Sequence, residues 1–379
     1  MTYLEALNLT QDLFQGDVTG TIPSEIGSLS RLESLQLLLG LRGTIPTEFG
    51  FLTSLTKLEL SENNLAGTIP SELGQLSRLA YLGLHQNIIS GLLPSEIFTL
   101  STLKYLTLDN NNLTTGTIPS DFGALTSLTK LDLSGTRRVG TIPTEFGRLS
   151  SLFELHMDLN YLSGAIPASF GRLSRLSTLT LVGNQLNGTL PSELGSLTNL
   201  ILLDLSYNGL MGPIPSQLGL LSNLSWLRIN VNALSGTIPT ELGSSTYLTD
   251  FEFSYNSLDG PIPSEMGFLA SLTVLSLRNN SLGGRIPPQL GQLKSLESLD
   301  VSFNRLTGTV PTQLGSLPKL SQVSIIQNKL TGSVEGIFCP QHVFLTPGAD
   351  GTYFPFQLEA DCGNVKCTCC TRCCEARHC

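Results

Sequence analysis

The chain has 379 residues, of which 13% are charged, and a formal net charge of −9. Globular domains usually carry about 25% charged residues, so this surface is poor in charge. The acidic balance argues against a nucleic-acid phosphate backbone as the partner. No apolar run reaches the roughly eighteen residues that a membrane helix needs, so we expect no membrane span in this chain.

A repeat of twenty-four residues organises most of the chain. Its marker prolines are Pro23, Pro46, Pro70, Pro94, Pro119, Pro143, Pro167, Pro191, Pro215, Pro239, Pro263, Pro287 and Pro311. The step is constant except for a shorter one near the start and a longer one before Pro119. Glu335 stands where the next proline is due, so we expect the array to end there. Such a period predicts a solenoid, in which each coil buries its apolar face against its neighbours.

Within one copy, the spacing of leucines and asparagines predicts a strand followed by a turn. Leu58 and Leu60 alternate with polar residues at the two-residue period of a strand, so both should point into the core. Asparagine recurs three residues after the second leucine, at Asn63, Asn87, Asn111, Asn160, Asn184, Asn208, Asn232, Asn256, Asn280, Asn304 and Asn328. An inward polar group is costly without partners, so each asparagine should bind the turn backbone.

The second half of each copy predicts a tight bend and a helical turn. Gly67 and its equivalents should supply a backbone conformation that other residues avoid. Ser71-Glu72 follows the proline and predicts the start of a short helical turn, which we expect Gly74 to close.

The pattern L-x-x-L-x-L-x-x-N-x-L-x-G-x-I-P resembles the leucine-rich repeat. Its G-x-I-P segment resembles the subclass found in plant receptor-like kinases and polygalacturonase-inhibiting proteins. The resemblance covers residues 1–338, about thirteen to fourteen repeats. It implies an α/β-type solenoid that is mostly β, with a concave parallel β-sheet and short helical turns on the convex side.

Two stretches depart from the pattern. Met1 is followed almost at once by strand leucines, with no signal peptide, so we expect an N-terminal cap and a targeting or anchor segment to be missing. In one central copy Thr136 replaces the asparagine and Arg138 the next leucine. An arginine cannot remain unpaired in an apolar column, so we expect this turn to bulge outward.

Residues 339–379 form a cysteine-rich segment that we expect to act as a C-terminal cap and tail. It contains Cys339, Cys362, Cys367, Cys369, Cys370, Cys373, Cys374 and Cys379, all the cysteines of the chain. Such a tail resembles leucine-rich repeat proteins predicted in diatoms and related algae. The even count predicts disulfides, with Cys339–Cys362 closing the cap. The alternatives are a zinc site, for which the C-x-x-C spacing of Cys370 and Cys373 is suitable, and lipidation.

Two groups of polar residues on the concave face are considered as a catalytic site or a metal site. Ser61, His85 and Asp109 fall in one column of successive strands, in the order of a hydrolase triad, but nothing supplies an oxyanion hole. Glu154 and His156 lie on one strand with Asp158, close to the acidic residues of the preceding strands. This second group suits either a divalent cation or a solvated acidic patch, and we assign no metal site, no catalytic residue and no cofactor.

The candidate ligand-binding residues are aromatic and basic side chains on the concave face. They are Tyr81, Tyr105, Phe153, His156, Trp226 and Arg228. Aromatic residues and arginine dominate binding hot spots. We discount Tyr207, Tyr255 and Phe303, because each precedes a repeat asparagine, where the family often has an aromatic residue.

Two further surface features are visible in the sequence. A threonine row in the G-x-I-P segments comprises Thr21, Thr44, Thr68, Thr117, Thr141, Thr189, Thr237 and Thr309, and suits either an ordered surface or ordinary strand preference. Glycosylation motifs occur at Asn8, Asn112, Asn187, Asn223 and Asn279.

These observations favour a non-enzymatic, extracellular or membrane-tethered recognition module that enters the secretory route. The resemblance implies receptor-like or inhibitor-like binding of a protein, a peptide or a cell-wall glycan. The alternatives are a structural or adhesive component of a cell wall and, more remotely, a hydrolase.

Overall fold

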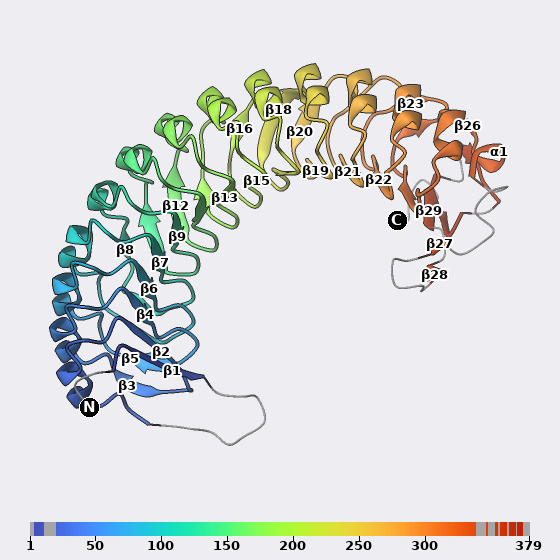
Figure 1. The fold of residues 1–379 in the computed structure, drawn as a ribbon. Helices are drawn as coiled ribbons and strands as arrows, with labels where there is room; N and C mark the ends of the chain where they lie inside the picture. The colour runs from blue at the N-terminus through green and yellow to red at the C-terminus, as the bar shows by residue number, and fades with distance from the viewer. Residues whose placement is uncertain are drawn as a thin grey trace. The chain divides into compact units, whose positions relative to one another are not determined.

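The computed structural model describes residues 4–10, 20–338, 346–347, 353–354, 357–361, 364–368 and 370–373. The chain forms two compact units, Met1–Leu186 (unit 1) and Asn187–Cys379 (unit 2). Both contain the same coil: a short inner strand, a turn, in most coils a second short strand, and one 3-10 turn on the outer side (Figure 1).

The inner strands of unit 1 form a parallel sheet. They are β1 (Ala6–Thr10), β2 (Ser34–Leu38), β4 (Lys57–Glu59), β6 (Tyr81–Gly83), β7 (Tyr105–Thr107), β9 (Lys130–Asp132), β11 (Glu154–His156) and β13 (Thr178–Thr180). The register sets Leu58 beside Leu82 and Leu82 beside Leu106. All three side chains are fully buried, which confirms the predicted apolar column.

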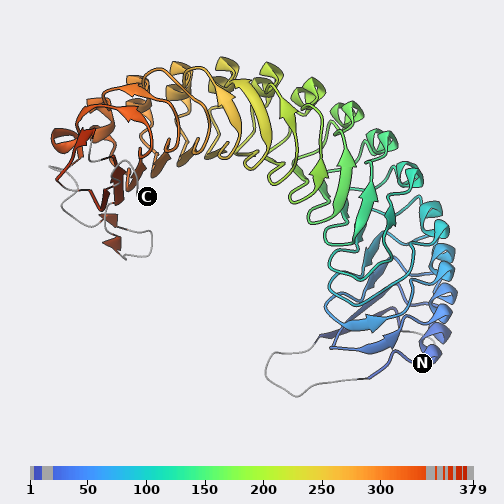
Figure 2. The same ribbon diagram turned by 180° about the vertical axis from the view of Figure 1, so that it is seen from behind.

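The outer parts of unit 1 are short second strands and 3-10 turns. Seen from behind, the second strands lie on one flank of the unit, between the inner sheet and the turns (Figure 2). These strands are β3 (Arg42–Thr44), β5 (Asn64–Ala66), β8 (Gly116–Thr117), β10 (Arg138–Gly140), β12 (Tyr161–Gly164) and β14 (Gln185–Leu186). The turns are η1 (Ser24–Ser28), η2 (Thr47–Phe51), η3 (Ser71–Gln75), η4 (Ser95–Thr99), η5 (Ser120–Ala124), η6 (Thr144–Arg148) and η7 (Ala168–Arg172).

Unit 2 repeats this plan. Its inner parallel sheet contains β15 (Leu202–Asp204), β17 (Trp226–Arg228), β19 (Asp250–Glu252), β21 (Val274–Ser276), β22 (Ser298–Asp300), β24 (Gln322–Ser324), β29 (Gln357–Ala360) and β31 (Arg372–Cys373). Its turns are η8 (Ser192–Ser196), η9 (Ser216–Leu220), η10 (Thr240–Ser244), η11 (Ser264–Phe268), η12 (Pro288–Gln292) and η13 (Thr312–Ser316). Its second strands are β16 (Met211–Gly212), β18 (Ala233–Thr237), β20 (Ser257–Asp259), β23 (Thr307–Gly308) and β25 (Lys329–Leu330).

The sheet of unit 2 continues beyond the last marked repeat. A short helix, α1 (Glu335–Phe338), takes the place of a 3-10 turn, and β29 then pairs in parallel with β24. Leu358 and Ala360 of β29 are fully buried, so this strand extends the apolar core by one coil. The remaining short strands here are β26 (Gly332–Ser333), β27 (Thr346–Pro347), β28 (Tyr353–Phe354) and β30 (Val365–Lys366).

The asparagine row joins neighbouring coils. Asn256 accepts a hydrogen bond from the backbone N–H of Leu234 in the preceding coil at 3.0 Å. Its amide nitrogen donates to the carbonyls of Ile229 and Phe253 at 3.0 and 3.2 Å. The same pattern occurs at Asn63, Asn87, Asn111, Asn160, Asn184, Asn232, Asn280, Asn304 and Asn328. This confirms that the row is structural.

The two glycines of each repeat serve different purposes. Gly67 has a φ of 76°, as predicted, and a Cβ there would lie 2.8 Å from the Thr44 methyl of the preceding coil. Gly74 has no positive φ, so the prediction that it closes the turn is wrong. A Cβ on Gly74 would lie 2.5 Å from the Cβ of Glu96, so this glycine is required for the close approach of η3 and η4. Each turn begins directly after a proline such as Pro70, without a side-chain cap.

The prediction that Arg138 bulges outward is also wrong. Its side chain is only 5% exposed and lines a small apolar cavity with Leu108 and Leu133. Its backbone N–H binds the Asn160 oxygen at 2.8 Å, as leucine does in other coils, but Arg137 before it has a φ of 58°, which the equivalent residues of the other coils lack. Nη2 has no hydrogen-bond partner within the described part of the chain, and burial lowers the pKa of this arginine.

The cysteine-rich segment is described only in part. Cys367 and Cys370 form a disulfide, so these two sulfurs cannot act as thiolate ligands of the alternative zinc site in this state. The predicted partners Cys339 and Cys362 lie outside the described residues, as do Cys369, Cys374 and Cys379. Cys373 is described only by its backbone, in β31.

Candidate functional site

The inner face of unit 1 brings three of the predicted ligand-binding residues close to one another. Tyr81 and Tyr105 are paired on β6 and β7, with ring centroids 5.6 Å apart. Tyr105 is 42% exposed, and Phe153, which directly precedes β11, is 50% exposed. Large aromatic surfaces therefore remain open to solvent along this part of the face.

A hollow of about 430 Å³ separates Tyr105 from Phe153. It is lined by Tyr105, Thr129, Lys130, Ser151, Phe153, Glu154 and Arg175. Lys130 and Glu154 are paired across β9 and β11, and their charged atoms lie 2.8 Å apart. The hollow thus combines two aromatic side chains, an ion pair and an exposed arginine.

His156 takes part in a hydrogen-bond chain behind this hollow. Thr180 donates to the carboxylate of Asp158 at 2.7 Å, so its oxygen accepts the Nδ1–H of His156 at 2.9 Å. Nε2 of His156 faces Glu154 at 3.6 Å. Burial opposes ionisation of Glu154, but Lys130 and His156 outweigh it and lower its pKa, whereas burial raises the pKa of Asp158. His156 is therefore oriented by polar neighbours and only partly exposed to a ligand.

The row of Ser61, His85 and Asp109 does not form the contacts of a triad. Nδ1 of His85 contacts Thr107 at 3.2 Å, and its Nε2 lies 3.9 Å from Glu62. Ser61 is 1% exposed, and its hydroxyl has no hydrogen-bond partner among the described residues. A buried serine without a hydrogen-bonded base is not an activated nucleophile, so these three residues do not form a catalytic triad.

Sequence reasoning missed a buried carboxylate on the same face. Glu59 is 6% exposed and lies over Gly83, where a Cβ would be 2.4 Å from its oxygen. Tyr81 donates a hydrogen bond to this carboxylate, and the backbone N–H of Ser61 binds its other oxygen at 3.1 Å. The signal in the sequence is a glycine, twenty-four residues after the glutamate, at a position where other coils carry a side chain.

In unit 2, the predicted residues Trp226 and Arg228 lie on β17. Trp226 is 36% exposed and pairs with Leu202 of β15. Arg228 binds the carboxylate of Asp250 through Nε and Nη2, at 3.2 and 3.0 Å. Partial burial opposes the charge of Arg228, but Asp250 and nearby Glu252 raise its pKa. This arginine is fixed in orientation while its side chain stays 36% exposed.

A second arginine of unit 2 was not predicted as a site residue. The guanidinium of Arg278 lies over the Phe303 ring at 4.5 Å and over the Tyr255 ring at 6.0 Å. Its Nε donates to the Tyr255 hydroxyl at 3.1 Å. Tyr255 and Phe303 had been discounted individually. Tyr255 and Phe303 are two repeats apart, and Arg278 lies in the repeat between them. This spacing was the signal in the sequence for an arginine held between two aromatic rings.

Comparison with known proteins gives several matches. Models described as leucine-rich repeats match residues 54–76, 77–137, 127–149, 175–197, 199–221 and 270–312. A leucine-rich repeat protein of Leptospira interrogans is 31% identical, with a TM-score of 0.68, and the match covers 87% of this chain and 86% of that one. The chain belongs to the leucine-rich repeat family. Its G-x-I-P repeats are of the plant type, as predicted.

Solved plant receptors are similar to this leucine-rich repeat chain. The plant peptide hormone receptor RGFR1, in complex with RGF2, is 37% identical over 88% of this chain, with a TM-score of 0.77. The Arabidopsis receptor kinase HAESA, in complex with the peptide hormone IDA and the co-receptor SERK1, is 31% identical over 95% of this chain, with a TM-score of 0.77. The chain spans 57% of the first protein and 63% of the second. A search of curated proteins found no match.

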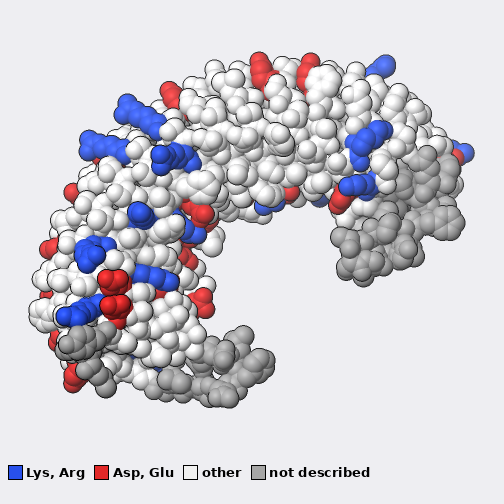
Figure 3. Space-filling model, viewed as in Figure 1, with Lys and Arg blue, Asp and Glu red and all other residues white. Residues whose placement is uncertain are grey.

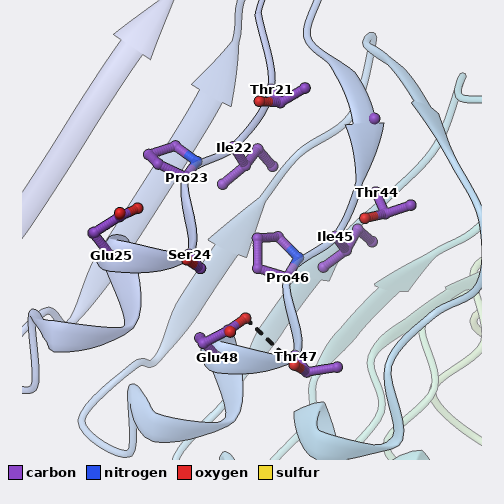
Figure 4. A pocket seen from close by; sticks show the side chains of 11 residues that line it. Thr21, Ile22, Pro23, Ser24, Glu25, Thr44, Ile45, Pro46, Thr47 and Glu48 are labelled. Atoms are coloured by element: carbon purple, nitrogen blue, oxygen red, sulfur yellow. Dashed lines mark hydrogen bonds between the residues drawn. The ribbon is translucent and has the colours of Figure 1, made fainter.

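The threonine row of the leucine-rich repeats lies on the flank formed by the G-x-I-P segments. Its members are exposed in both units. In unit 1, Figure 4 shows Thr21 and Thr44 on successive coils, beside a shallow pocket of about 670 Å³. The methyl group of Thr21 lies over Gly43 of the next coil, where it would be 2.9 Å from an added Cβ. Packing against glycine thus explains why threonine recurs here.

The asparagines of the glycosylation motifs are exposed. They are Asn8, Asn112, Asn187, Asn223 and Asn279, so each is sterically open to modification.

Within the described ranges, no group of three or more His, Cys, Asp or Glu residues is arranged to hold a metal ion. In the same part of the chain, no helix has the length and apolar character needed to cross a membrane.

Proposed function

We propose that this leucine-rich repeat chain is a receptor-like recognition module that binds a peptide or protein ligand through its inner sheet. The observation that carries the proposal is the likeness to RGFR1 and HAESA, which were solved with peptide hormones bound. The exposed Trp226 beside the fixed Arg228 supplies the kind of anchor that such binding uses.

The proposed location is extracellular or at a cell surface, reached by the secretory route. The plant receptors that resemble the chain support this assignment. The Cys367–Cys370 disulfide also favours an oxidising compartment. The proposed module has no catalytic role, and any signal would pass through another segment or another chain.

A capture experiment tests the ligand surface. The immobilised chain is exposed to a displayed library of secreted peptides, and bound sequences are resynthesised and titrated by calorimetry. Trp226→Ala should weaken binding of a selected peptide about tenfold or more, because hot-spot aromatics contribute more than about 1 kcal/mol each. Leu220→Ala, which removes a side chain that is 63% exposed on the outer turn η9, is the matched control and should bind normally.

Two results would contradict the proposal. If Trp226→Ala and Arg228→Ala both retain full affinity, the ligand does not contact this part of the inner sheet. If the chain is instead recovered in fixed proportion from an insoluble wall fraction, and both variants are recovered equally, the structural or adhesive role would replace recognition.

A further inference from the structure

The hollow of unit 1 presents a specific combination of groups. Tyr105 and Phe153 border it with side chains that are 42% and 50% exposed. Ser151 contributes a hydroxyl group, Thr129 a hydroxyl oxygen whose proton is donated to the Lys104 carbonyl, and the exposed side chain of Arg175 completes the lining. Apolar rings, hydroxyls and a guanidinium are therefore available together to one small chemical group.

The positive charge that is free in this hollow belongs to Arg175. Lys130 is paired with Glu154 at 2.8 Å, so its charge is already neutralised. Glu154 also faces His156 at 3.6 Å. No ion pair of Arg175 is found within the described part of the chain. A ligand that enters the hollow thus meets one unpaired guanidinium, which suits a carboxylate through two parallel hydrogen bonds.

The charged residues around the hollow indicate along which surface an extended ligand would run. Arg172 and Arg148 end η7 and η6, are exposed, and have no acidic partner among the described residues. Figure 3 shows Lys and Arg side chains on this flank of unit 1. The inner face next to Lys130 instead carries Asp132 and other aspartates. An anionic polymer would be repelled along the inner face and attracted across the flank.

We propose that this hollow binds an acidic sugar unit of a polysaccharide. The apolar face of the pyranose ring would contact Tyr105 and Phe153, and its carboxylate would bind Arg175. This inference rests on the proposed function, because it assumes that the inner sheet and its edge are a ligand surface. It adds that the ligand at this hollow is an acidic glycan.

A peptide fits this position less well. An acidic side chain on a peptide is flexible, whereas a uronic acid holds its carboxylate in fixed relation to an apolar ring face. The two exposed aromatic rings and the nearby guanidinium match the second geometry better.

The test is a calorimetric titration of the whole chain with a galacturonic acid oligomer. The probe's methyl ester is the matched ligand control, because it keeps the rings and removes the charges. Arg175→Gln should weaken binding about tenfold, as expected for the loss of a charge-assisted pair. Arg78→Gln is the matched protein control, since Arg78 is exposed in the same Ser-Arg-Leu turn of an earlier coil and does not line the hollow.

The aromatic contact is tested in parallel. Phe153→Ala should also weaken binding about tenfold or more. Tyr161→Ala removes a similarly exposed aromatic residue on β12, away from the hollow, and should bind as the original chain does. Thermal unfolding of each variant checks the fold, which we expect to be unchanged because the substituted positions are exposed.

Three outcomes overturn the inference. Equal affinity for the oligomer and its methyl ester would remove the role of charge. An unchanged affinity of Arg175→Gln would place the ligand elsewhere. Tighter binding of poly-glutamate, in competition with the oligomer, would assign the hollow to an acidic peptide. Trp226→Ala reports on peptide recognition in unit 2 separately, so either proposal can fail while the other holds.

Discussion

The hydroxyl of Tyr81 donates a hydrogen bond to the carboxylate of Glu59 on the neighbouring strand, with an O–O distance of 2.5 Å. Glu59 is 6% exposed although it lies on the inner, otherwise solvated face. Burial raises the pKa of Tyr81, and the adjacent carboxylate raises it further. The phenol therefore remains a donor at neutral pH and satisfies an oxygen of this buried carboxylate.

Tyr81→Phe should destabilise the chain. The change leaves the Glu59 carboxylate with the backbone N–H of Ser61 as its remaining donor within the described part of the chain, so we expect a loss of about 1–3 kcal/mol in the free energy of unfolding. Urea unfolding measures this. Tyr105→Phe is the control, because Tyr105 makes no such bond to Glu59 and is largely exposed. Equal stability of the two variants would show that the hydrogen bond contributes nothing.

Gly83→Ala should also destabilise unit 1. An added Cβ would lie 2.4 Å from a Glu59 oxygen, so the buried carboxylate must shift and its hydrogen bond to Tyr81 should weaken. We expect a lower thermal unfolding midpoint, measured by circular dichroism. Gly116→Ala is the control, since the nearest atom to its added Cβ is 3.7 Å away. If Gly83→Ala destabilises a Glu59→Ala variant as much as it destabilises the original chain, the contact with Glu59 is not the cause.

The sequence predicted features that depend on position within one repeat. The leucine columns, the asparagine row and the positive φ at Gly67 follow from the period, because every coil repeats the same local requirement. The burial of Glu59 did not follow, since it depends on a glycine and a tyrosine of the next coil. Gly74 was misassigned for a related reason: its constraint comes from the Cβ and backbone of Glu96 in the neighbouring turn.

The candidate site was predictable only in part. The exposed aromatics could be placed on the inner face by their column, and Tyr81 and Tyr105 are adjacent as expected. The hollow combines Tyr105, Phe153 and Arg175, which occupy three different positions of the repeat on three different coils. Column reasoning relates like positions only, so it could not bring these residues together.

Arg138→Leu should stabilise the chain. The arginine occupies a leucine position, is 5% exposed and leaves Nη2 without a partner among the described residues. Removing a buried unsatisfied donor should raise the free energy of unfolding by about 1–3 kcal/mol. The measurement is urea unfolding at neutral pH.

Arg137→Leu is the matched control for this change. Arg137 has a φ of 58° and an exposed side chain that binds Asn112, and the equivalent position of the next coil is Tyr161. We expect a change within about 0.5 kcal/mol. A loss of stability in Arg138→Leu would mean that the guanidinium makes a favourable contact that outweighs its burial.

Asp109→Asn should stabilise the chain in a pH-dependent way. Burial raises the pKa of Asp109, and the charge of Asp132 raises it further, although His85 acts in the opposite direction. The folded chain therefore holds this proton more tightly than the unfolded chain, whose pKa is near 3.8. Stability is lost as the pH rises from that value through the folded pKa.

The variant removes this loss, because asparagine cannot ionise. Thermal midpoints of the variant and the original chain should be similar near pH 3 and should separate in favour of the variant toward pH 7. Asp121→Asn, an exposed change on η5, is the control for net charge. The chain has a net charge of −9, so removal of any acidic group should reduce charge repulsion and favour the folded state. A separation no larger than that of the control would contradict the burial of Asp109 beside Asp132.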